Sequence, residues 1–179
     1  MKNPTNRLST LFLAAAVVAG TTAVPQAALA DAAGFLKSIE GSWKGAGTAK
    51  LPGRDGSERV SCRVTSSYAE SETALQVKGD CATTQAKTPV NGKITHNGNS
   101  VSGSLINGLG TATMVKSQGQ VKGNQLVVLS NFVDDQTGQL TRSRQVISKT
   151  GNGFQAAFFL YDNASKKFEP AGQLKFTAN

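Results

Sequence analysis

Short runs of β-prone residues alternate with Asn–Gly turn signals along most of the chain, and this punctuation constrains the fold more than any other feature. The signals are Asn91-Gly92, Asn97-Gly98, Asn107-Gly108, Gly123-Asn124 and Gly151-Asn152-Gly153. Strands at this spacing predict an all-β sandwich or barrel. At Asn91-Gly92 the alternation of apolar and polar residues continues through the glycine, so here we expect a strand interior rather than a turn.

A helix is favoured only near the start of the predicted domain. Residues 31–39 place Phe35, Leu36 and Ile39 on one helical face. After them, no run of about 12 residues carries apolar side chains at helical spacing. Because the chain shows no linker, composition break or true repeat, residues 31–179 are predicted to form a single domain.

The first 30 residues have the layout of a secretory signal peptide. Lys2 and Arg7 form a positive start, residues 11–20 form an apolar run, and Ala28-Leu29-Ala30 is a small-x-small cleavage site. The apolar run is too short to span a bilayer, so we expect cleavage and a mature chain without a transmembrane segment. Cleavage leaves 17 basic and 11 acidic residues, a net charge of +6. The predicted location is periplasmic or secreted.

Two neighbouring strands contain both cysteines, and their register can be derived. With Ser71-Glu72 at the turn centre, Tyr68 faces Leu75 and Cys62 faces Cys81. The same register pairs Ser66 with Val77 and Val64 with Gly79. Opposed antiparallel residues come within disulfide range, and exported cysteines usually pair, so a structural disulfide is predicted. The alternative, a redox-active dithiol, usually has Cys-x-x-Cys spacing near a helix start.

A second hairpin is predicted around Asn97-Gly98, a dipeptide favoured in type I′ turns. A turn centred there brings apolar positions of the two strands together. The expected pairs are Ile94 with Val101, Gly92 with Gly103 and Val90 with Leu105.

The remaining strands complete an antiparallel meander. They are predicted at residues 41–50, 112–115, 125–133, 139–149, 154–161 and 167–177. About eight to ten strands in sequence order, with one apolar face, most simply close on themselves and so remove exposed edges. Pro170 cannot donate to a strand ladder, so an edge or a bulge is expected in the last strand. The predicted fold is therefore a closed or partly open β-barrel with a short N-terminal helix.

Gly41-Ser42-Trp43 opens the first predicted strand directly after the short helix. This arrangement resembles the lipocalin and wider calycin barrels, in which the Trp plugs one end of the barrel, and the resemblance implies that role for Trp43. The stretch 41–82 is also similar to a group of uncharacterised exported proteins of Gram-negative bacteria. Periplasmic metalloprotease inhibitors share a small disulfide-bearing barrel with an early Gly-x-Trp. Their flexible N-terminal segment enters the protease, and this likeness would give that role to residues 31–35.

One His and two Cys limit the chemistry available to the chain. A Ser-His-Asp relay would need His96 held by a buried carboxylate, and we expect His96 to be a solvated polar residue beside its hairpin turn. A zinc site needs three or four ligands, and the predicted disulfide uses both thiols. Solvated turn acids without calcium-loop spacing are expected at Glu70, Glu72, Asp134 and Asp135. No catalytic residue, metal or cofactor is predicted.

Basic residues are spread over strand positions that are predicted to face outward. Arg59, Arg63 and Lys78 fall on the outer face of the first hairpin, and Arg142 and Arg144 share one face of a later strand. The first interpretation of such a spread is solubility, and the second is weak attraction to anionic envelope polymers or lipid head groups. Nucleic-acid binding is not expected, because the chain has a signal peptide and its sequence does not interleave aromatic and basic residues.

The most apolar strand of the predicted domain covers residues 154–161. Phe154, Phe158 and Leu160 share one of its faces, and together with Tyr68 they are our candidates for lining a ligand site. The alternative is that these side chains fill the core, as in many small barrels. A hollow interior would instead suit a lipid-like or aromatic ligand.

The combined patterns predict a non-enzymatic exported barrel, most simply a monomer. It would bind a small hydrophobic ligand or serve the cell envelope. The alternative function is that of a protein-binding module such as a periplasmic protease inhibitor.

Overall fold

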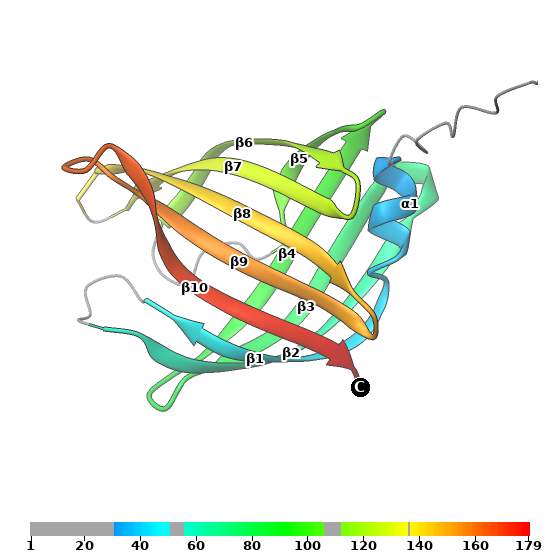
Figure 1. The fold of residues 1–179 in the computed structure, drawn as a ribbon, viewed down its shortest axis with the longest axis horizontal. Coiled ribbons are helices and arrows are strands. Elements are labelled where there is room, and N and C mark those ends of the chain that lie inside the picture. The colour runs from blue at the N-terminus through cyan, green and yellow to red at the C-terminus, as the bar shows by residue number, and fades with distance from the viewer. Residues whose placement is uncertain (1–30, 51–55, 106–111, 136) are drawn as a thin grey trace, which may run out of the picture.

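The computed structural model describes residues 31–50, 56–105, 112–135 and 137–179, which form a closed antiparallel β-barrel with a short helix at one end (Figure 1). The helix α1 spans Ala32–Lys37, and a 3₁₀ turn, η1, spans Glu70–Glu72. The strands are β1 (Gly41–Ala49), β2 (Glu58–Ala69), β3 (Ala74–Ala82), β4 (Lys87–Asn97), β5 (Ser100–Ser104), β6 (Ala112–Lys122), β7 (Gln125–Asp134), β8 (Leu140–Thr150), β9 (Gly153–Asp162) and β10 (Lys167–Ala178). Each strand pairs with its sequence neighbours, and β1 pairs with β10 to close the barrel. The predicted fold class is confirmed, with closure rather than an open edge.

Two predicted features fall outside the described residues. They are the signal peptide, residues 1–30, and the turn signal Asn107-Gly108. In the ranges that the structure covers, no helix has the length and apolar character needed to cross a bilayer.

Most strands agree closely with the predicted ranges, and β6 is the main exception. Residues 112–115 were expected, whereas β6 continues to Lys122 and pairs with β7 along its length. A bulge between Met114 and Lys116 interrupts this pairing. The polar run that follows the bulge has low intrinsic β propensity, so pairing with an apolar neighbour, rather than its own sequence, makes it a strand.

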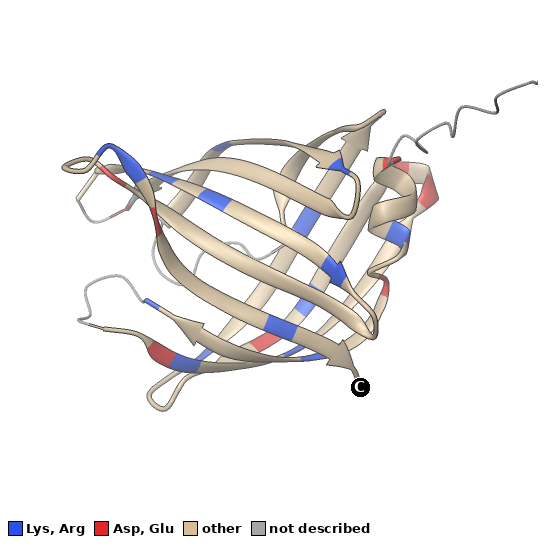
Figure 2. Ribbon diagram, viewed as in Figure 1, with Lys and Arg blue, Asp and Glu red and all other residues tan. Residues whose placement is uncertain are grey.

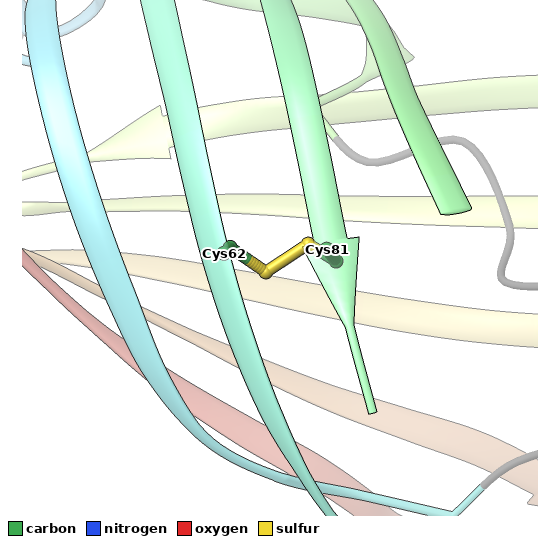
Figure 3. Close-up of a disulfide and its surroundings, with 2 residues drawn as sticks. All are labelled: Cys62 and Cys81. Carbon is green, nitrogen blue, oxygen red and sulfur yellow. A yellow bond between two sulfur atoms is a disulfide. The ribbon is translucent and has the colours of Figure 1, made fainter. Parts of the chain in front are cut away.

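The hairpin of β2 and β3 has the predicted register. Tyr68 pairs with Leu75, and Cys62 pairs with Cys81. The connection contains η1 and ends at Thr73, whose φ of 46° lies in the left-handed region. The two cysteines form the predicted disulfide, with Cα atoms 4.0 Å apart (Figure 3).

The predicted register of β4 and β5 is wrong by two residues. Ile94 pairs with Gly103 rather than with Val101, and His96 takes the place opposite Val101. The turn centre moves to Gly98-Asn99, where Gly98 has a φ of 57° and supplies the first central residue of a type II′ turn. Because the shift is an even number of residues, every side chain still points to its predicted face.

Several opposed pairs inside the barrel combine a large with a small residue, and this favours the observed register. Gly79 lies between Val64 and Val90, and Gly92 faces Val77. Ile94 faces Gly103 in the same way. The predicted register would instead have placed Ile94 opposite Val101 and Val90 opposite Leu105, and it would have left Gly92 opposite Gly103 with no side chain between them.

The helix α1 covers one end of the barrel (Figure 1). Asp31 caps it by accepting hydrogen bonds from Ala33 N and Gly34 N. The side chains of Phe35 and Leu36, on the helix itself, are buried. Trp43 lies at the same end and donates from Nε1 to Ile39 O at 3.1 Å.

Aromatic side chains form the core below this end. Trp43 meets Phe154 edge-on at 5.2 Å between ring centroids, and Phe154 stacks on Phe176 at 4.6 Å. Edge-on and stacked pairs are the favourable geometries for aromatic rings. The helix and these three rings therefore close one end of the barrel.

The last strand contains the irregularity that Pro170 predicts. The pairing of β10 with β9 shifts between Pro170 and Gly172, which is the signature of a bulge. Pro170 itself is exposed. The bulge removes the need for a donor at the proline, so β10 pairs on both sides and the barrel stays closed.

Candidate functional site

Below α1, where the described residues line the barrel, side chains fill most of the interior. The cavity there has a volume of about 20 Å³ and is lined by residues that include Trp43, Ile147, Phe154, Phe158 and Phe176. About 10–15 Å³ is enough for one water molecule, whereas sites for drug-sized ligands have roughly 300–1,000 Å³. Core filling is therefore the better description of this aromatic cluster.

The four candidate ligand-lining residues do not form one site. Phe154 and Phe158 line the cavity. Leu160 lies toward the other end of β9 and is 40% exposed. Tyr68 lies at the end of β2 nearest α1, where Lys37 Nζ sits 5.0 Å from its ring centroid. The structure thus separates these side chains, and a ligand-binding role for them stays a prediction.

His96 lies in a strand rather than in a solvated turn. Its Nε2 is 2.6 Å from Tyr68 Oη, and the two rings are stacked at 6.0 Å between centroids. Its Nδ1 is buried and has no hydrogen-bond partner in the described part of the chain. The register shift moves His96 away from the turn centre and pairs it with Val101, and its position in the alternation of β4 puts it on the same inward side as Ile94.

Glu70 and Glu72 are ion-paired rather than only solvated. Glu70 pairs with Lys37 of α1 at 2.5 Å, and this hydrogen bond raises the pKa of Lys37. Glu72 pairs with Lys93 of β4 at 2.6 Å, and this hydrogen bond lowers the pKa of Glu72. Both pairs are exposed and join elements that the sequence does not place side by side. Asp135 is exposed as expected.

Residues 31–35, the segment that the inhibitor resemblance singles out, begin α1 instead of forming a free arm. Asp31 caps the helix, and Ala32 and Phe35 are buried against the barrel. A segment held in this way would have to unpack from the barrel end before it could enter a protease.

The outer wall of the barrel is strongly basic. In the described strands, side chains that alternate with the buried positions face outward, and eleven of the twelve charged ones are Lys or Arg. They are Lys44, Arg59, Arg63, Lys78, Lys87, Lys93, Lys116, Lys122, Arg142, Arg144 and Lys175, with Asp80 as the single acid. Figure 2 shows basic residues along the strands and acidic residues mainly toward strand ends and α1.

Arg142 and Arg144 on β8 lie against aromatic rings on the outer wall. Arg142 Cζ is 3.5 Å from the Tyr161 ring centroid, and Arg144 Cζ is 4.4 Å from that of Phe159 and 5.3 Å from that of Phe168. We call these five residues the Arg–aromatic patch. Basic and aromatic residues do interleave here, but across three strands, so a search along the sequence misses them. Pairing residues 142 and 144 with the alternating 159 and 161 of the next strand could have found them.

Comparisons with family models and with curated proteins find no match for this chain. Within the residues that the structure covers, no group of three or more His, Cys, Asp or Glu side chains is arranged to hold a metal ion. The features on which a function can be argued are therefore the filled interior and the basic outer wall.

Proposed function

We propose that this protein is a non-enzymatic exported barrel that acts at the cell envelope by binding an anionic envelope surface. The observation that carries the proposal is the charge of the outer wall, where basic side chains outnumber acidic ones eleven to one in the described strands. The barrel scaffold presents these charges and the packed core keeps their positions fixed.

The outer wall is positively charged because its basic residues lie along the strands, away from most of the acidic residues. Acidic residues such as Glu70, Glu72 and Asp162 lie at turns and strand ends, so they compensate the wall only locally. A positively charged surface attracts polyanions, and this attraction weakens with salt because dissolved ions screen it. Envelope surfaces rich in phosphate or carboxylate are negatively charged and therefore complement the basic wall.

Two further observations support the exported, non-enzymatic part of the proposal. The disulfide between Cys62 and Cys81 suits an oxidising compartment outside the cytoplasm. His96 contacts Tyr68, and its buried Nδ1 has no carboxylate partner in the described residues, unlike the histidine of a catalytic triad. The packed interior makes a ligand held inside the barrel the less favoured function.

Cell fractionation tests the proposal. We expect the native protein to sediment with the envelope at low ionic strength and to be released by salt. Reversing three wall charges, in Lys44→Glu, Lys116→Glu and Lys175→Glu together, should lower the salt concentration needed for release.

A matched control reverses three lysines that lie off the wall, in Lys50→Glu, Lys166→Glu and Lys167→Glu together. Both triple variants have the same net charge, so only the position of the charges differs. Native protein that stays entirely in the soluble fraction at low ionic strength would contradict the proposal. Equal salt release of the two variants would contradict the role of the wall.

A further inference from the structure

We propose that the face formed by β7, β8, β9 and β10 docks on an anionic phospholipid bilayer. The guanidinium groups of Arg142 and Arg144 would contact lipid phosphates, and neighbouring Leu side chains would enter the head-group region. This inference rests on the proposed function and deepens it by naming the anionic component and the face that binds it.

Apolar side chains surround the two arginines on this face. Leu129 pairs with Arg144 across β7 and β8 and is 44% exposed, and Leu140 is 54% exposed. Val115, at the bulge of the adjacent strand β6, is 63% exposed. Among the described residues, three of the four large exposed hydrophobic side chains thus lie on or beside this face. Clustered apolar exposure of this kind marks interaction surfaces.

The arginines are held in place, and no described acidic side chain is ion-paired with Arg142 or Arg144. Each guanidinium lies against a ring, which covers one of its faces and leaves edge N–H groups for an oxygen acceptor. Arg144 Nε is buried and has no hydrogen-bond partner among the described residues, so the terminal N–H groups of this guanidinium are the ones left to meet a phosphate. Two guanidinium groups two residues apart on one strand, about 7 Å, can engage neighbouring phosphates.

Charged side chains at the outward positions of this face are basic wherever the structure describes them. The outward positions of β7 to β10 in the described residues hold Arg142, Arg144 and Lys175 but neither Asp nor Glu. Each Lys or Arg near an anionic bilayer strengthens binding about fivefold. An uninterrupted cationic face with exposed leucines therefore has the two features that hold a protein at a lipid surface, charge and apolar contact.

The shape of the face argues against other occupants. Extended peptides add to free sheet edges, and a closed barrel has none. A second copy would bring like charges together. Sugars stack on open aromatic faces, whereas the rings of Tyr161 and Phe159 are covered by Arg142 and Arg144. A wide convex surface fits a bilayer better than it fits any of these.

Vesicle co-sedimentation tests this assignment with purified, disulfide-bonded mature protein. The vesicles are neutral phosphatidylcholine alone or phosphatidylcholine with a quarter phosphatidylglycerol. We expect binding only to the anionic vesicles. The double variant Arg142→Gln, Arg144→Gln should weaken that binding about 25-fold.

The matched control is Arg59→Gln with Arg63→Gln on β2. It removes the same charge from the far side of the strand ring, where the neighbouring outward residues are polar. We expect at most about a threefold loss, because a face turned away from the bilayer is screened at distances beyond the Debye length of roughly 10 Å. Circular dichroism and thermal melting check that both variants fold.

A fluorescence measurement tests the apolar contact separately. An environment-sensitive dye on Leu129→Cys should shift to the blue on anionic vesicles, whereas the same dye on Thr65→Cys of β2 should not. Equal shifts at both positions, or none at either, would overturn docking through this face.

The outcomes separate this inference from the proposed function. Native protein that binds envelopes but not protein-free anionic vesicles would overturn the lipid assignment, leave the envelope function standing and point to an acidic protein or polysaccharide. Equal weakening by the two arginine double variants would overturn the assigned face and leave diffuse binding by the whole wall. Native protein that binds neither envelopes nor vesicles would overturn both.

Discussion

Gly103 shows how the absence of one side chain can set a strand register. Its φ is 104°, and a Cβ atom at this position would lie 2.0 Å from the carbonyl oxygen of Lys93. Only glycine tolerates both conditions. Ile94 then fills the space opposite, and the register of β4 and β5 follows from this pairing rather than from the turn dipeptide.

Replacement of Gly103 tests this account at the residue scale. Gly103→Ala combines an unfavourable φ with a backbone clash, so we expect the free energy of unfolding to fall by about 2 kcal/mol or more. Denaturant unfolding measures the change.

Gly151→Ala is the control, because a Cβ atom there meets nothing within 4 Å. It should change stability by less than about 0.5 kcal/mol. Similar effects of the two substitutions would mean that the close approach at Gly103 does not set the register.

At the scale of elements, two of the contacts that hold the hairpin of β2 and β3 lie near its opposite ends. The disulfide joins the two strands (Figure 3) at a pair that lies seven residue pairs from the turn-side pair Ala69–Ala74. Near the turn, Glu72 of η1 reaches Lys93 on β4. The covalent and the ionic contact together tie the hairpin to itself and to its neighbour.

The disulfide is expected to supply a large part of the stability of this hairpin. It closes a loop with a sequence separation of 19, which corresponds to about 3 kcal/mol from restriction of the unfolded chain. Reduction should lower the unfolding midpoint accordingly. Intact mass before and after reduction and alkylation identifies the bond, and two free thiols in the native protein would refute it.

The Glu72 pair predicts a pH dependence whose sign is defined. Its pKa in the folded protein is lowered from the ordinary value of 4.5, chiefly by the hydrogen bond from Lys93. The pair therefore stabilises the fold above pH 4.5, and this contribution is lost as the pH falls through the lowered pKa. Because the pair is exposed, we expect the effect on stability to be small.

NMR titration of the Glu72 carboxyl group checks this directly. Lys93→Met should return its pKa toward the ordinary value, while Lys78→Met on the adjacent strand should leave it lowered. A pKa that is the same in the native protein and in Lys93→Met would show that the pair does not form in solution.

Particular residues show what the sequence could and could not predict. The Cys62–Cys81 register was predictable because a polar turn and strict alternation fix it locally. The β4–β5 register was not, because it depends on how Ile94 and Gly103 share the barrel interior. The Arg–aromatic patch escaped for a related reason, since Arg144 and Phe159 meet only once strands are paired. The sequence predicted features that neighbouring residues determine, whereas contacts between paired strands could be identified only in the folded structure.

At the scale of the whole molecule, the filled interior determines what the barrel can carry. A cavity of about 20 Å³ leaves no room for a lipid-like molecule. Native mass spectrometry of the mature protein purified from its producing cells should therefore give the mass of the polypeptide alone.

A hollowed variant provides the comparison. Phe158→Ala enlarges the apolar cavity, so it should take up a small aromatic molecule such as benzene, as dry apolar cavities do. A co-purifying apolar ligand in the native protein would show that the interior opens to bind it.

The closure of the barrel also has a consequence for how the protein is made. β1 pairs with β10, the strand farthest from it in the sequence, so two strand edges stay unpaired until the end of the chain is available. A polypeptide that crosses a membrane from its N-terminus onward delivers β10 last. For a chain delivered in this order, the barrel closes only after β10 has crossed, so the last strand determines when the fold is complete.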